Sequence, residues 1–233
     1  MEAQTIINVQ SEIKNAINEA FKLAFEKSRG DFVALIGFGE KQGLQSGCCD
    51  NKSDEIYSYK VGDKSDYLFV TDKIEFMSNY LNKHYKDSCF LYQGSEGKDC
   101  ISIELMIYTL IWESFFYLKS LVRLSQLAIG NKYKWELNVP NEGKWNFVND
   151  NIIKPLQDNN LLLGTVVQQS FSSDLRNSFA HSMFRIDESI NMIEYWSKRW
   201  KECHLISFED FQMKFFKSAY LSLCLHSQSL KMY

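Results

Sequence analysis

Residues that interrupt helices are scarce in this sequence. Only 2 of its 233 residues are proline and 11 are glycine, and this scarcity favours long helices over a loop-rich architecture. A composition with 45% hydrophobic and 15% aromatic residues excludes an intrinsically disordered chain. The length suits one large domain with a substantial buried core, and we predict a single helical domain over residues 1–233.

A strong charge of either sign is also lacking. The formal net charge of −3 provides no basic field over the whole molecule, so any binding of nucleic acid requires a local basic patch. The 6 cysteines show no repeated C-x-x-C spacing, and we expect reduced thiols in a cytoplasmic protein. No pairing of cysteine with histidine has the spacing of zinc ligands, and we expect neither a metal nor another cofactor.

Long uncharged apolar runs are absent as well. The most apolar stretch, residues 101–129, is interrupted by four charged residues: Glu104, Glu113, Lys119 and Arg123. This many charges exclude a membrane span and are typical of a buried helix. Residues 1–20 are interrupted by polar residues and carry no small-residue cleavage pattern, so we expect no signal peptide and no contact with a membrane.

Apolar residues instead recur at intervals of three and four, the period of amphipathic helices. The helices predicted on this basis span about residues 5–29, 71–85, 102–129, 145–157, 161–180 and 207–224. Gly30 is expected to end the first helix, and Pro155 to kink or break the fourth. Apolar residues cover most of the circumference of helix 102–129, so it should lie at the centre of a bundle.

Residues 31–70 do not follow the helical period. We expect short strands at 57–61 and 67–70, separated by a turn at Gly62 and Asp63. The glycines at 37, 39 and 43 do not have the spacing of a phosphate-binding G-x-G-x-x-G loop, and we expect a flexible loop there. We interpret the whole segment as an insertion that covers the bundle.

Alternating apolar residues on both sides of Asp187-Glu188-Ser189 predict a β-hairpin. The hairpin follows the segment with the highest density of polar groups, which contains Arg176, Asn177 and His181. Asn177 and His181 are four residues apart and share a helix face, so the amide can orient the imidazole. Arg176 and His181 are separated by about 140° around the axis, at roughly 100° per residue. A phosphate between them would be held more easily if a second copy of the helix faced the first.

The pattern Arg176-Asn177-x-x-x-His181 at a helix end resembles the Arg-x4-His signature of HEPN domains (higher eukaryotes and prokaryotes nucleotide-binding). Asparagine directly after the arginine is the form found in their ribonuclease branches. The residue-by-residue match covers only 174–187. The resemblance implies a mainly all-α fold, an antiparallel HEPN-like helical bundle, and the predicted hairpin after the motif fits this architecture.

The resemblance also implies a metal-independent endoribonuclease. Such cleavage needs a base for the 2′-hydroxyl, a cation for the phosphorane and an acid for the departing 5′-oxygen. His181 suits the proton transfers and Arg176 suits the phosphate. Because one chain supplies only one of each, the resemblance implies a homodimer whose two copies complete the site. The products would carry 2′,3′-cyclic phosphate and 5′-hydroxyl ends.

Toxins and abortive-infection effectors against phage are common in this family, and an antitoxin or other regulatory protein is therefore a further candidate partner. One branch has a tyrosine two residues after the histidine, which a nucleotidyltransferase antitoxin modifies. Met183 stands at that position here. This difference argues against that particular partnership.

Acidic and basic residues outside the motif complete the candidate site. In HEPN proteins an acid on an earlier helix often pairs with the arginine or histidine, and Glu113 is the first candidate here, with Glu104 second. A structural salt bridge or an exposed position is the alternative for Glu113. Three cations beside Trp196 and Trp200 form a candidate RNA-binding group, with an ordinary solvated face as the alternative: Lys198, Arg199 and Lys201.

Alternatives also exist for the motif itself. His181 could cap the helix end, and Arg176 could pair with Asp174 or Glu188. The corresponding alternatives for function are a non-catalytic HEPN-like module that binds nucleotide, RNA or a protein partner, and a purely structural helical protein. The remaining histidines are expected to be surface or packing residues: His84, His204 and His226.

Overall fold

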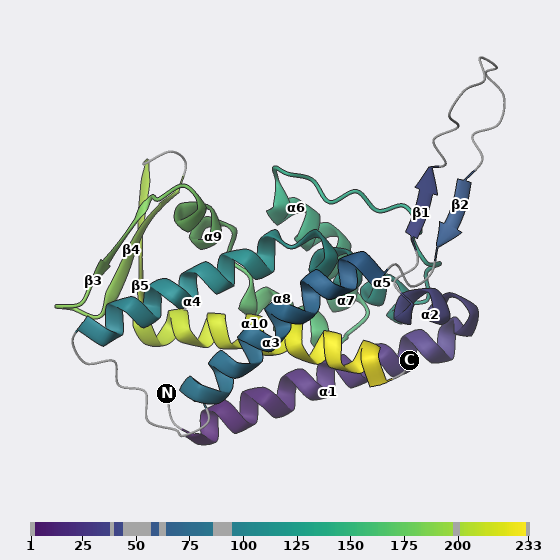
Figure 1. Ribbon diagram of the computed structural model, residues 1–233, viewed down its shortest axis with the longest axis horizontal. Helices are drawn as coiled ribbons and strands as arrows, with labels where there is room; N and C mark the ends of the chain where they lie inside the picture. Colours follow the sequence, from purple (N-terminus) through teal and green to yellow (C-terminus); the bar gives the residue numbers. More distant parts are fainter. Residues whose placement is uncertain are drawn as a thin grey trace, which may run out of the picture.

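Long helices dominate the computed structural model (Figure 1), which describes residues 3–37, 40–43, 57–60, 64–85, 95–197 and 201–231. The longer helices are α1 (Ala3–Lys27), α3 (Lys64–Tyr85), α4 (Ser95–Glu113), α5 (Phe115–Ala128) and α10 (Phe208–Lys231). The shorter ones are α2 (Arg29–Ile36), α6 (Lys144–Val148), α7 (Lys154–Asp158), α8 (Leu162–Ser170) and α9 (Ser173–Ala180). The prediction of a mainly helical bundle is confirmed.

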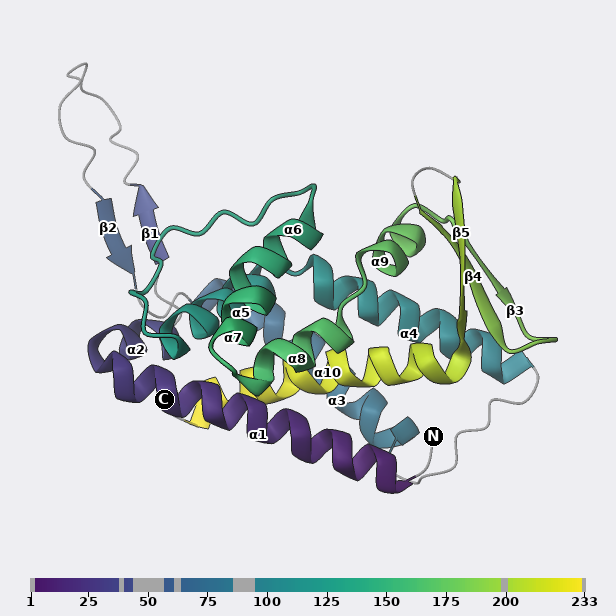
Figure 2. The ribbon, with the colours of Figure 1, turned by 180° about the vertical axis from the view of Figure 1, so that it is seen from behind.

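Helix α10 lies in the middle of the bundle, where it packs against α1, α4 and α8. Figure 2 shows it running beside α1 beneath α4 and α8. Its side chains Phe211, Phe215 and Phe216 are fully buried, at the spacing that places them on one helix side. Removing a side chain of this size from water contributes about 1.5–3 kcal/mol. The aromatic face of α10 is therefore a main source of stability for the bundle.

The predicted helix 102–129 is wrong as a single element, because it breaks at Ser114. The backbone of Ser114 is extended there, and its hydroxyl accepts a hydrogen bond from the Tyr117 amide at 3.3 Å. The axes of α4 and α5 differ by 57° across this break. Helix α5 is buried along nearly its whole length, whereas α4 exposes Ile103, Met106 and Leu110. The predicted central position therefore applies to α5 more than to α4.

Among the described residues, no single helix has the length and apolar composition needed to cross a membrane. Helices α4 and α5 reach that length and composition only when they are taken together across their bend.

The predicted helix 161–180 is also interrupted, at Phe171 and Ser172. Both residues have extended backbones, and they separate α8 from α9. The hydroxyl of Tyr108, from α4, donates to the Ser170 carbonyl at 3.0 Å and accepts from the Ser172 amide at 2.8 Å. One buried tyrosine thus bonds backbone groups on both sides of the break, and the hydroxyl of Ser218 on α10 also donates to the Ser170 carbonyl, at 3.2 Å.

The predicted interruption near Pro155 takes the form of a π-helical turn, Asn149–Ile153, between α6 and α7. Proline has no amide hydrogen, so Pro155 cannot donate to the carbonyl of Asn151 four residues earlier. The side-chain amide of Gln126, on α5, donates to that carbonyl at 3.2 Å. A residue from a neighbouring helix therefore replaces the missing backbone hydrogen bond.

The predicted hairpin after the motif is confirmed. Strand β3 (Phe184–Asp187) pairs antiparallel with β4 (Met192–Ser197), and β4 pairs with β5 (Glu202–Ser207). The third strand was not predicted. The buried hydroxyl of Ser178 donates to the Trp196 carbonyl at 2.5 Å and thereby connects α9 to the sheet. In Figure 1 the sheet stands at one end of the bundle beside α9.

The last predicted helix begins as expected. The hydroxyl of Ser207 accepts from the Asp210 amide at 3.1 Å, which is a typical N-cap. Helix α10 then continues to Lys231, beyond the predicted end at residue 224.

The N-terminal part differs from the prediction in several places. Helix α1 ends at Lys27, and Gly30 lies within α2 instead of ending the first helix. Residues 67–70 are helical because α3 begins at Lys64, so the strand predicted there is wrong. The other predicted strand corresponds to β2 (Tyr57–Lys60), which pairs with β1 (Glu40–Gly43), where a loop was expected. Residues 38–39, 44–56 and 61–63 of the proposed insertion, with the predicted turn at Gly62 and Asp63, lie outside the described residues.

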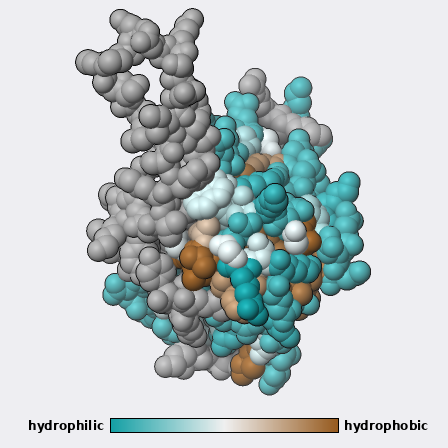
Figure 3. All heavy atoms as spheres, turned by 90° about the vertical axis from the view of Figure 1, so that its right-hand side faces the viewer, coloured by the Kyte–Doolittle hydropathy of each residue, from teal (hydrophilic) through white to brown (hydrophobic). Residues whose placement is uncertain are grey.

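Figure 3 shows the end of the molecule at which α1 passes into α2. The described surface there is mostly hydrophilic, with a few apolar side chains between the polar ones. Phe25 on α1 and Val33 on α2 are both exposed. Isolated exposed apolar residues of this kind are normal for a folded protein and carry no functional argument.

The break between α8 and α9 yields a test of stability. Tyr108→Phe would remove the hydroxyl that bonds Ser170 and Ser172, and we expect the free energy of unfolding to fall by about 1–3 kcal/mol, because the Ser172 amide loses its acceptor and the Ser170 carbonyl keeps only the Ser218 hydroxyl. Urea unfolding followed by circular dichroism measures this loss. The matched control is Tyr195→Phe, which removes the hydroxyl of a half-buried tyrosine on β4 that does not bond Ser170 or Ser172. Equal losses in both variants would contradict this account of the break.

Candidate functional site

Arg176 lies in the first half of α9 and points back towards the end of α4. Its side chain is 8% exposed, and its Nη1 donates to the Oε1 atom of Glu113. The Nε atom of the same guanidinium is buried and has no hydrogen-bond partner among the described residues. A buried arginine held by one carboxylate therefore forms the centre of the site.

The Glu113 carboxylate binds a second cation, which sequence reasoning missed. Its Oε2 atom accepts a hydrogen bond from the Nζ atom of Lys144, whose side chain is 1% exposed. That amine also lies 5.6 Å from the centre of the Phe115 ring, a favourable distance for a cation–π contact. Lys144 begins α6 directly after Gly143, whose φ of 68° is the left-handed conformation that glycine adopts easily.

The charges of this group are unequal, since two buried cations share one carboxylate that is itself 36% exposed. Burial of a charge is costly unless an opposite charge and hydrogen bonds compensate for it. Glu113 supplies that compensation, and one positive charge remains in excess. Such an excess favours the approach of an anion, for example a phosphate.

His181 occupies the C-cap position of α9, but capping of the helix by its imidazole stays a prediction. Its backbone amide donates to the Asn177 carbonyl at 3.0 Å, and the residue is exposed. Its imidazole forms no hydrogen bond with the Asn177 side chain among the described contacts. The expected orientation of the imidazole by that amide is therefore not formed in this structure. Arg176 points into the molecule and His181 lies at its surface.

The acidic candidates are distinguished by their contacts. Arg176 pairs with Glu113, whereas no described contact joins it to Asp174 or Glu188. Glu104, the second candidate, is buried and accepts from the Tyr85 hydroxyl at 2.6 Å, on the side of α3. The expected pairing of Glu113 with the motif arginine is thus present in the structure, and its role in catalysis stays a prediction.

Tyr108 lies close enough to Arg176 for the charge of the guanidinium to affect the pKa of the phenol. Burial raises the pKa of Tyr108, and this effect outweighs the opposing influences of the Ser172 amide and of Arg176. The phenol therefore stays protonated and acts as a structural hydrogen-bonding group at the α8–α9 break.

The predicted RNA-binding group cannot be placed as a whole. Lys201 is exposed just before β5, but Lys198 and Arg199 lie outside the described residues. The three other histidines have packing contacts. His84 stacks on Tyr80, His204 stacks on Tyr195, and His226 is buried in α10.

Metal ligands do not gather at the site. Across the described ranges, no group of three or more histidine, cysteine, aspartate or glutamate side chains could hold a metal ion. The structure describes three cysteines, of which Cys203 is exposed and the other two are half-buried: Cys100 and Cys224.

Comparison with protein-family models, with curated proteins and with solved structures found no significant match. A function can therefore be inferred only from the residues of this chain and their arrangement.

Stability measurements can test whether the Glu113 carboxylate compensates for the charges of Lys144 and Arg176. Glu113→Gln leaves the buried Lys144 and Arg176 without a counter-charge, and we expect a loss of about 1–3 kcal/mol in the free energy of unfolding, reduced by the partial exposure of Glu113. Lys144→Met in the same chain removes one uncompensated cation and should recover part of this loss. Urea unfolding of both single variants and of the double variant gives the coupling free energy between Glu113 and Lys144.

Glu194→Gln is the matched control, because Glu194 contacts the exposed Arg185 at 3.8 Å on the sheet. Exposed pairs of this kind contribute about 0–1 kcal/mol. A double variant that is less stable than Glu113→Gln alone would show that the carboxylate does not compensate for the lysine charge.

Proposed function

We propose that this protein is a metal-independent endoribonuclease of HEPN type that acts as a homodimer. The observation that carries the proposal is Arg176-Asn177-x-x-x-His181 at the end of α9, with Arg176 held by Glu113 and His181 exposed at the helix end. The helical bundle and the hairpin after the motif support it. The expected products carry 2′,3′-cyclic phosphate and 5′-hydroxyl ends.

In this proposal each residue has a separate role. His181 transfers the protons, because an imidazole can both accept and donate a proton. Arg176 stabilises the charge that develops on the phosphate. The resemblance makes Glu113 a candidate catalytic residue, but its carboxylate contacts the side chains of Arg176 and Lys144, and we assign it the role of a positioning residue. Asn177, half-buried beside Arg176, completes the motif.

The proposed dimer follows from the number of groups in one chain. Cleavage needs both a base and an acid, and the motif supplies one histidine per chain. Because His181 lies at the surface, a second copy can approach it. A role as a toxin or abortive-infection effector, with an antitoxin or other regulatory partner, is part of the same proposal and rests on the family resemblance alone.

A non-catalytic module that binds RNA, nucleotide or a protein partner is the second candidate. The buried position of Arg176 favours it, because the guanidinium is already engaged by Glu113 before any RNA is bound. In such a module the motif would stabilise the junction between α4 and α9, and His181 would cap the helix.

Cleavage of RNA in the presence of EDTA tests the proposal. We expect the purified protein to cut RNA without added metal, and His181→Ala to slow cleavage by roughly 10²–10⁴-fold, the usual contribution of a general acid–base group. His181 is exposed, so this variant should keep its stability. His84→Ala, which changes a histidine on α3, is the control and should cleave like the unaltered protein.

Arg176→Ala should also lose cleavage, and its unfolding curve must be measured because the substitution removes a buried ion pair. Analysis of the RNA ends distinguishes the cyclic phosphate from a 3′-hydroxyl product. Cleavage that is unchanged in both His181→Ala and Arg176→Ala would rule out this site. RNA that is retained but never cleaved would support the non-catalytic module.

A further inference from the structure

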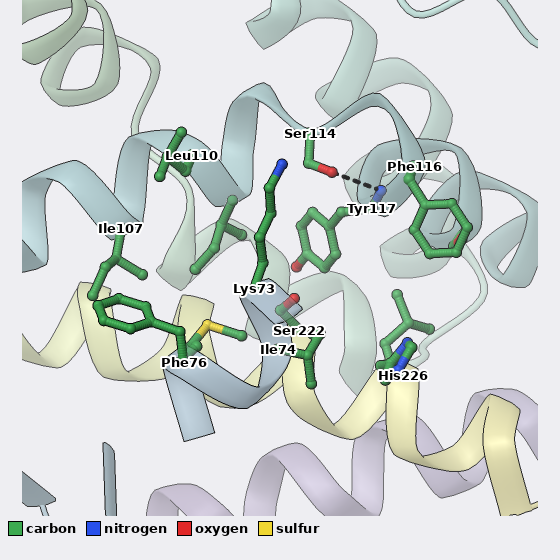
Figure 4. A pocket seen from close by; sticks show the side chains of 14 residues that line it. Lys73, Ile74, Phe76, Ile107, Leu110, Ser114, Phe116, Tyr117, Ser222 and His226 are labelled. Atoms are coloured by element: carbon green, nitrogen blue, oxygen red, sulfur yellow. Dashed lines mark hydrogen bonds between the residues drawn. The ribbon is translucent and has the colours of Figure 1, made fainter. Parts of the chain in front are cut away.

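A pocket of about 290 Å³ lies between α3, the junction of α4 with α5, and the C-terminal half of α10 (Figure 4). Its walls are mostly apolar, with Met77 from α3, Ile107 and Ile111 from α4, and Leu225 from α10. None of the described residues that line it is acidic. Its size and apolar walls are typical of a site for a small molecule.

Tyr117 places a polar group within these apolar walls. The tyrosine is buried in the first turn of α5, and its hydroxyl has no hydrogen-bond partner among the described residues. Burial raises the pKa of Tyr117, so the hydroxyl keeps its proton and can donate a hydrogen bond. Native proteins rarely leave a buried hydroxyl unpaired. A ligand with an acceptor atom in the pocket would supply the missing partner.

Lys73 supplies the charge at the mouth of the pocket. It is exposed on α3, and Figure 4 shows its side chain running past Tyr117 with the amine on the side of Ser114. His226 also lines the pocket, and burial lowers the pKa of its imidazole, which favours the neutral form. Lys73 is therefore the main charge among the described residues that line the pocket, and it favours a ligand with a negative group.

The volume limits the size of the ligand. A pocket of about 290 Å³ lies at the small end of ligand sites, which span about 300–1,000 Å³, so it suits a small molecule. A carboxylate with an alkyl chain of medium length has this size, one negative group and an otherwise apolar body.

We propose that this pocket binds a medium-chain carboxylate, with the alkyl chain along α4 and the carboxylate between the Tyr117 hydroxyl and the Lys73 amine. The hydroxyl and the amine each donate a hydrogen bond to a carboxylate oxygen. The alkyl chain replaces water against Ile107 and Ile111, which is favourable in proportion to the apolar area covered. This site is separate from the cluster of Arg176, Glu113 and Lys144, and it does not depend on the proposed ribonuclease activity.

Isothermal titration of the full-length protein with octanoate tests the proposal. We expect binding at one site per chain, weaker binding of octan-1-ol, which lacks the charge, and no binding of octyltrimethylammonium. Tyr117→Phe and Lys73→Met should each weaken the affinity for octanoate by about tenfold or more, as expected for the loss of a hydrogen bond to a charged group.

Two tryptophan variants locate the site. Leu110→Trp changes an exposed residue that lines the pocket and should block it without disturbing the core. Ile103→Trp changes another exposed residue of α4, which does not line the pocket, and should leave octanoate binding unchanged.

Three results would overturn the proposal. The first is a lack of octanoate binding to the unaltered protein, and the second is equal binding by the two tryptophan variants. The third is equal affinity for octanoate and for the octyl cation, since the lysine would then play no part. If octanoate does not bind and Leu110→Trp instead converts a dimer to a monomer in gel filtration, the pocket belongs to an interface between two copies.

Discussion

The carboxylate of Glu113 holds together three segments that are far apart in the sequence. Glu113 is the last residue of α4, and its carboxylate binds Arg176 on α9 and Lys144 at the start of α6. Both cations are almost completely buried, and each would be strongly destabilising without a nearby negative charge. The position of α9, and with it the position of the motif, therefore depends on an interaction between charges as well as on apolar packing.

The break at Ser114 determines where that carboxylate lies. If α4 and α5 formed one straight helix, Glu113 would continue along a regular helix face. The bend of 57° instead places it at the end of α4. On the other side of the same break, Ser114 and Tyr117 line the apolar pocket. One interruption of a long apolar segment thus contributes residues to both candidate sites of the molecule.

Interruptions elsewhere follow a common physical rule, in which a distant side chain satisfies the backbone groups that a helix leaves unpaired. Tyr108 does this at the α8–α9 break, and Gln126 does it before Pro155. These two side chains come from α4 and α5, the most apolar stretch of the sequence. Their polar atoms allow the other helices to bend without leaving buried groups unsatisfied.

The sequence by itself determined the helical class, most of the long helices, the hairpin after His181 and the capping of α10 by Ser207. Each of these depends on periodicity or on a local hydrogen bond, which neighbouring residues specify. It also pointed to Glu113 as a partner for Arg176, through the resemblance of the motif to the HEPN family.

Only the tertiary structure decided where the long apolar segments break, because the apolar pattern continues through Ser114 and through Phe171. The hydrogen bond from Tyr108 to Ser170 joins residues 62 positions apart, and no local sequence pattern predicts such a contact. Lys144 was missed for the same reason, since a lysine at the start of a short helix has no distinguishing sequence signal until the fold brings Glu113 to it. The position of a buried charge is set by its distant partner, and that partner is known only once the chain has folded.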